Sequence, residues 1–203
     1  MNTIRSVCVY CGSSAGRSPI YVEAGQTLGR GIAQAGLRLV YGGGARGVMG
    51  AVADGALRAG GKVTGIIPRF LVNREANGPA LARLDELVVT DNMHQRKHAM
   101  FEKSDAFVAL PGGIGTVEEI IEIMTWAQLG HHRKPIVFGN VSGFWNPMLA
   151  LIDHMTTEGF IHTAQLVRPL VVDQADAIVP AILVAASSAD APMEGDDAVI
   201  EKM

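Results

Sequence analysis

The sequence predicts a doubly wound, Rossmann-like α/β domain, in which a parallel sheet carries helices on both faces. Short apolar runs alternate along the chain with longer segments of helical pattern. The apolar runs are continuous, as expected of strands that are buried on both faces. Glycine-rich or polar residues follow most of these runs directly. In open parallel sheets, ligands bind outside the carboxyl ends of the strands, where these residues would lie.

Seven apolar runs are predicted strands: residues 7–10, 37–41, 62–67, 86–90, 106–110, 135–138 and 169–172. Six segments of helical pattern lie between or after them: residues 19–34, 48–59, 93–103, 116–129, 144–158 and 173–184. Residues 68–83 form a long connection, and connections of this length are usually functional or disordered.

The chain has 203 residues, which suits one domain with a sizeable core. Hydrophobic residues make up 48% and charged residues 18%, as expected for a well-buried sheet and a subunit interface. We expect one domain over residues 1–186 and an acidic, disordered tail over 187–203. The net charge is −3, of which residues 187–203 carry −4 and residues 1–186 about +1, so no basic stripe for nucleic acid is expected.

The apolar runs also bear on where the chain resides. No run reaches the roughly 18 residues of a membrane span, and residues 6–10 are too short for the core of a signal peptide. The only cysteines are Cys8 and Cys11, which leaves no disulfide framework, so a cytoplasmic location is expected. Cys8 lies inside a predicted strand, whereas a redox C-x-x-C begins a helix, so both cysteines are predicted to be packing residues.

The strongest local signal is the loop from Pro111 to Thr116, which joins a predicted buried strand to a predicted helix. Its three glycines let an oxyanion approach the backbone N–H groups, and the helix N-terminus adds free donors and a positive dipole end. The spacing matches neither the P-loop nor the dinucleotide fingerprint. It therefore predicts a phosphate site without specifying ATP or NAD.

Two interpretations of the next residues remain open. Thr116 and Glu119 have the spacing of a capping box, in which the pair only satisfies amides of the first helical turn. Alternatively, Glu118 or Glu119 stands beside a bound anion, where a carboxyl group tends toward a raised pKa and suits acid–base or nucleophilic chemistry.

A second glycine loop spans residues 42–47 and formally matches G-x-G-x-x-G. A dinucleotide site also needs an acidic residue at the end of the next strand, where this chain has Pro68 and Arg69. The loop, with Gly43 and Gly44, is therefore predicted to be a second wall of a mononucleotide pocket.

The helix that begins at Met93 carries Arg96 and Lys97 near the same predicted sheet edge. Arginine offers a planar fork to phosphate or carboxylate, and lysine offers a point charge. The alternative is an ordinary solvated helix face. His94 and His98 have a spacing that could share a metal, but no third ligand follows, so no metal is expected.

Several blocks together resemble the LOG ("Lonely Guy") family of cytokinin riboside 5′-monophosphate phosphoribohydrolases. The segment from Pro111 to Glu119 is similar to the family's PGGxGTxxE signature. Similar blocks occur at residues 7–14, 41–44, 66–68, 93–97 and 125–130, and the resemblance covers about residues 5–175. Residues 76–83 (ANGPALAR) depart from the more polar pattern usual in the family.

The resemblance implies that Arg96 and Glu119 form the catalytic pair. The nucleotide site would be lined by Glu75, Arg96, Lys97, Gly112, Gly113, Ile114, Gly115, Thr116, Val117, Glu118, Glu119 and Thr125, with Ser14, Gly43, Gly44 and Met93 from neighbouring loops. The family is usually homodimeric and uses no metal or organic cofactor.

The implied reaction is hydrolysis of the N-glycosidic bond of AMP or N6-prenyl-AMP, giving a free base and ribose 5-phosphate. Members have often been labelled lysine decarboxylases. A pyridoxal-phosphate enzyme needs a Schiff-base lysine, a phosphate cup and a pyridinium partner, and the residues here do not support one. The alternative function is a nucleotide- or cofactor-binding carrier without hydrolysis, and the joint presence of Arg96 and Glu119 favours the enzyme.

Overall fold

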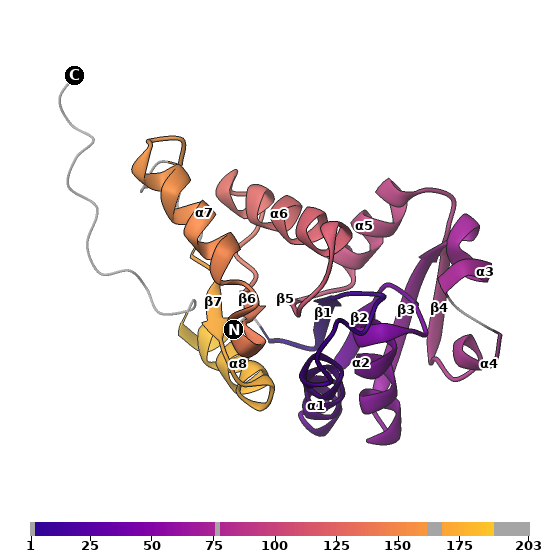
Figure 1. Cartoon of the computed structure of the whole chain (residues 1–203). Helices are drawn as coiled ribbons and strands as arrows, with labels where there is room; N and C mark the ends of the chain where they lie inside the picture. The colour runs from indigo at the N-terminus through magenta and orange to yellow at the C-terminus, as the bar shows by residue number, and fades with distance from the viewer. Residues whose placement is uncertain (1–2, 76–77, 162–167, 189–203) are drawn as a thin grey trace.

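One parallel sheet of seven strands organises the chain (Figure 1). The computed structural model describes residues 3–75, 78–161 and 168–188. The strand order is β4-β3-β2-β1-β5-β6-β7, and every pair of neighbours is parallel. The predicted fold class is therefore confirmed. The strands are β1 (Ser6–Tyr10), β2 (Arg38–Tyr41), β3 (Lys62–Pro68), β4 (Glu86–Thr90), β5 (Ala106–Ala109), β6 (Ile136–Gly139) and β7 (Leu170–Val172).

Helices cover both faces of the sheet, as Figure 1 shows. On one face α1, α2 and α8 bury apolar side chains against the strands, and on the other α5, α6 and α7 do so. The main helices are α1 (Ile20–Gln34), α2 (Gly47–Arg58), α5 (Met93–Glu102), α6 (Ile114–Gln128), α7 (Asn146–Thr157) and α8 (Ile178–Ser188). None of the helices in the described part of the chain is long and apolar enough to cross a membrane.

The strand order reverses between β1 and β5. From β1 the chain moves outward through β2, β3 and β4, and then returns so that β5 pairs with the other side of β1. Ligands bind at such a switch point, because the loops on its two sides diverge to opposite faces.

Three predicted ligand loops meet at this point and are joined by backbone hydrogen bonds. Gly12, after β1, donates its N–H to the carbonyl of Pro111, after β5, over 3.1 Å. The N–H of Met49, in α2, donates to the carbonyl of Gly12 over 3.0 Å. The expected clustering of glycine loops at one sheet edge is therefore observed.

The structure differs from the sequence prediction in two segments. The predicted long connection contains three short helices: η1 (Arg69–Leu71), α3 (Val72–Glu75) and α4 (Gly78–Leu81). After β7 the chain forms a loop and a short 3-10 turn, η4 (Ala175–Ala177), so α8 starts later than predicted. It then continues to Ser188, past the expected end of the domain, and the rest of the predicted tail lies outside the described residues.

Both cysteines pack in the core, as predicted. Cys8 and Cys11 are free thiols that are 0% and 3% exposed. Burial raises the pKa of both thiols well above the usual range. They are therefore protonated, and neither has the exposed thiolate character of a reactive cysteine.

Candidate nucleotide site

The loop before α6 presents open backbone at the switch point. The helix begins at Ile114, with Gly113 at its N-cap position, which offers no side chain to the first-turn amides. A Cβ placed on Gly113 or on Gly115 would meet no other heavy atom within 4 Å. Neither glycine has a positive φ, so neither the packing nor the backbone conformation requires a glycine at these two positions. They leave space in which an anion can approach the helix N-terminus.

The capping-box interpretation of this loop is wrong. Thr116 lies inside the first turn of α6 and is 4% exposed. The hydroxyl oxygen Oγ1 of Thr116 packs on Gly112, because a Cβ placed on Gly112 would lie 2.1 Å from this oxygen. A side-chain cap is present instead at α5, where Asn92 Oδ1 accepts a hydrogen bond from the N–H of Gln95 over 3.0 Å. This cap fixes the start of the helix that carries Arg96.

Arg96 and Glu119 form a buried pair beside the loop. Arg96 is 5% and Glu119 is 8% exposed, and Nη2 lies 3.6 Å from Oε1. The Nε of Arg96 is buried and has no hydrogen-bond partner among the described residues. Buried polar groups are usually hydrogen-bonded, so Arg96 keeps a buried donor that the described residues leave unsatisfied.

The adjacent glutamate has a different environment. Glu118 has a half-exposed side chain, and its Oε1 accepts from Lys97 Nζ over 2.5 Å. Glu122, one turn further along α6, accepts from the same nitrogen over 3.1 Å. Burial lowers the pKa of Lys97, but the two carboxylates outweigh it, so the pKa of Lys97 is raised. Lys97 is therefore a charged link between α5 and α6, which was not expected from the sequence.

The other predicted lining residues come from several elements of the fold. Gly44 donates its N–H to Met49 Sδ over 3.2 Å, and Met93 Sδ accepts from Arg96 Nη1 over 3.9 Å. Thr125 is exposed on α6 and donates its hydroxyl to the carbonyl of Ile121. The predicted contact of Glu75 lies outside the described residues, because only its backbone is described, at the end of α3.

Gly43, Ile114, Val117 and Ser14 are the remaining members of the predicted set, and Gly43 has a positive φ of 76° in the loop after β2. Ile114 is 85% exposed, whereas Val117 packs against the core beneath α6. Ser14 lines a cavity of about 210 Å³ together with Gly112, Gly113 and the aromatic rings of Tyr21 and Phe144.

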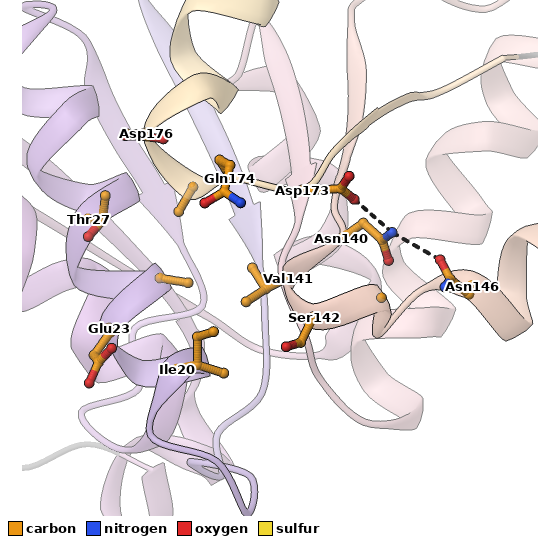
Figure 2. A pocket seen from close by; sticks show the side chains of 13 residues that line it. Ile20, Glu23, Thr27, Asn140, Val141, Ser142, Asn146, Asp173, Gln174 and Asp176 are labelled. Atoms are coloured by element: carbon orange, nitrogen blue, oxygen red, sulfur yellow. Dashed lines mark hydrogen bonds between the residues drawn. The ribbon is translucent and has the colours of Figure 1, made fainter.

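A larger cavity, of about 680 Å³, lies elsewhere on the same sheet edge, between α1 and the loops after β6 and β7 (Figure 2). Its charged lining residues are all acidic: Glu23, Asp173 and Asp176. Asn140 at its wall donates hydrogen bonds to Asp173 and Asn146, both over 3.0 Å. Carboxylates disfavour a phosphate, so this cavity does not fit the predicted ligand.

Within residues 3–75, 78–161 and 168–188, no group of three or more His, Cys, Asp or Glu could hold a metal ion.

Two residues that build the site lie after predicted strands, and the sequence assigned neither of them a role. Gly12 connects the loops after β1, β2 and β5, and Asn92 caps α5. Asn92 could have been found from its spacing to Gln95, which matches the cap-and-third-residue pattern at a helix start. The role of Gly12 depends on the order of the strands, and no local signal indicates it.

The fold and site define a Rossmann-like α/β protein with an open glycine loop at a helix N-terminus and a buried Arg–Glu pair at the switch point. A family model with the description "possible lysine decarboxylase" matches residues 49–182. Cytokinin riboside 5′-monophosphate phosphoribohydrolase LOG7 of Arabidopsis thaliana is 46% identical over 77% of this chain and 71% of its own. A cytokinin riboside 5′-monophosphate phosphoribohydrolase of Rhodococcoides fascians is 45% identical over 89% of this chain and 90% of its own. The chain belongs to this family, that of the LOG phosphoribohydrolases.

Solved structures agree on the fold. The molybdenum cofactor carrier protein of Chlamydomonas reinhardtii superposes with a TM-score of 0.67 at 20% identity, over 91% of this chain and 99% of its own. The molybdenum cofactor binding protein of Rippkaea orientalis gives 0.64 at 20% identity, over 90% and 97%. At this identity the likeness concerns the architecture alone.

Proposed function

We propose that this chain hydrolyses the N-glycosidic bond of adenosine 5′-monophosphate and of its N6-modified forms, releasing the free base and ribose 5-phosphate. The observation that carries the proposal is the buried Arg96–Glu119 pair beside an open glycine loop. Relatives that are 45–46% identical are named as phosphoribohydrolases of cytokinin riboside 5′-monophosphates.

The loop before α6 would bind the 5′-phosphate. The open positions at Gly113 and Gly115 leave room for phosphate oxygens beside the first-turn N–H groups of α6. The positive end of the helix dipole adds to this attraction. The phosphate would then fix the distance of the ribose from Glu119, which lies in the next turn of the same helix.

Glu119 would stabilise the transition state. Cleavage of the bond between base and ribose places positive charge on the sugar, so a carboxylate beside it stabilises the transition state more than the ground state. Glu119 acts there as nucleophile or as the base toward water. Burial keeps bulk water from screening its charge.

Arg96 would orient the substrate. The guanidinium holds the phosphate or a ribose oxygen through donors that Glu119 leaves unused. Lys97 and Glu118, as a pair, would form the rim of the site, and Glu75, Met93, Thr125, Ser14, Gly43 and Gly44 are proposed to line the rest of it.

The test is an incubation of the protein with AMP and with N6-isopentenyl-AMP, followed by chromatography for the free base and an assay of ribose 5-phosphate. The expected result is equal amounts of base and sugar phosphate from at least one nucleotide. The matching nucleoside serves as control and should react poorly, because it lacks the phosphate. Measurable nucleotide binding without release of base from either compound would contradict the hydrolase and support the carrier alternative.

We also propose that the protein is a cytoplasmic homodimer. Large apolar side chains are exposed on α6, on α7 and in the turns that follow them: Ile114, Leu129, Leu151 and Phe160. Such exposed apolar surface commonly marks a protein interface. The two buried free thiols agree with a reducing compartment. Light scattering after gel filtration should give twice the mass of the 21.5 kDa chain, and a monomer would contradict the dimer.

A further inference from the structure

The loop after β2 contains a glycine whose role follows from one close contact. A Cβ placed on Gly42 would lie 2.2 Å from Arg96 Nη2 and 3.3 Å from Arg96 Cζ. The guanidinium of Arg96 therefore rests directly on the backbone of Gly42. Gly42 does not have a positive φ, unlike its neighbour Gly43 with φ 76°. The backbone conformation therefore does not require a glycine at position 42. The lack of space does: Arg96 is by far the closest neighbour, and Met49 Sδ, at 3.3 Å from the same Cβ, adds a second, milder contact.

The guanidinium is held at this place from other sides as well. Nη2 faces Glu119 at 3.6 Å, and Nη1 faces Met93 Sδ at 3.9 Å. The side chain of Arg96 is 7% exposed. A methyl group at position 42 would therefore displace the guanidinium and disturb its contact with Glu119. The end of an arginine side chain is flexible, so this displacement should cost the fold little.

We propose that Gly42 is a positioning residue for the reaction: the absence of a side chain there fixes the guanidinium of Arg96 against Glu119. This inference rests on the proposed function and deepens it. It gives a reason for the glycines of residues 42–47. This loop resembles a dinucleotide fingerprint, although the acidic partner of that fingerprint is missing. The first glycine of the loop makes room for an arginine of the same chain.

The test compares Gly42→Ala with Gly31→Ala. On Gly31, in α1, a Cβ would meet only Val179, at an ordinary 3.8 Å. Gly42→Ala should lower kcat/KM for the nucleotide by about 10²-fold, because displacements near 1 Å in an active site have effects of this size. Its Tm should stay within about 4 °C of the parent, as expected when only a flexible side-chain end moves. Gly31→Ala should keep the parent rate. Full activity of Gly42→Ala would overturn the proposal.

A double-mutant cycle separates positioning from a general effect on the fold. In the Arg96→Ala background there is no guanidinium to displace, so adding Gly42→Ala should change neither the residual rate nor the AMP affinity. An equal fold-loss in both backgrounds would overturn the role of Gly42 through Arg96.

A ligand-free readout keeps this inference distinct from the proposed function. The buried Nε–H of Arg96 should give a protected ¹⁵N–¹H signal in NMR spectra, identified by its loss in Arg96→Ala. Gly42→Ala should shift or broaden this signal, and Gly31→Ala should leave it in place. If the parent protein releases no base, the proposed function fails, but this signal still tests whether Gly42 positions the guanidinium of Arg96. An unmoved signal in Gly42→Ala would refute it.

Discussion

Replacing Glu119 by glutamine tests the chemistry that we assign to the buried pair. The change removes one negative charge and preserves the size of the side chain, at a position that is 8% exposed and 3.6 Å from a guanidinium. If the carboxylate stabilises positive charge on the ribose, its loss should lower kcat by about 10²-fold or more, which corresponds to roughly 2.7 kcal/mol of barrier. AMP binding should persist, because the glycine loop is unchanged.

The assay is release of base under saturating AMP, with AMP affinity measured separately by calorimetry. Glu122→Gln is the matched control, because it removes the same charge from the same helix. Lys97 then retains Glu118 as a partner, so the loss of the half-buried contact should cost no more than about 1 kcal/mol and leave the rate unchanged. Normal hydrolysis of AMP by Glu119→Gln would refute the assignment. A larger loss in Glu118→Gln than in Glu119→Gln would assign the role to the neighbouring glutamate.

Three further predictions concern stability. Burial lowers the pKa of His132, so the folded protein binds fewer protons there than the unfolded chain. The free energy of unfolding should therefore decrease as the pH falls below about 6.5. In His132→Gln, urea unfolding should show a weaker dependence of this free energy on pH. Asp105 Oδ2 accepts from the N–H of Arg5 and from the N–H and hydroxyl of Ser6, so Asp105→Ala should lower the unfolding free energy by about 1–3 kcal/mol, and an unchanged denaturant midpoint would contradict this. A Cβ on Gly29 would lie 2.0 Å from the backbone oxygen of Val52, so Gly29→Ala should force α1 and α2 apart. The free energy of unfolding should fall by roughly 3 kcal/mol. An equal or higher free energy of unfolding would contradict this close packing of the two helices.

The sequence by itself determined the fold class, most of the elements and the region of the site. Continuous apolar runs predict strands buried on both faces, and all seven strands formed near their predicted positions. Glycines after those runs predict where backbone must stay open, and two of them, Gly113 and Gly115, do stay open. These signals are local, because burial and backbone freedom depend on the residue types in a short stretch of chain.

Only the tertiary structure decided which side chains meet. Adjacent helix positions point about 100° apart, so the rotation of α6 against α5 turns Glu119 toward Arg96 and leaves Glu118 and Glu122 for Lys97. The sequence pattern alone allowed Thr116 and Glu119 to cap the helix, but the helix begins earlier and buries both. The strand order then brings Gly42 from the loop after β2 against Arg96 from α5. These contacts join segments far apart in the chain, and their geometry is fixed by packing across the sheet, which no local pattern contains.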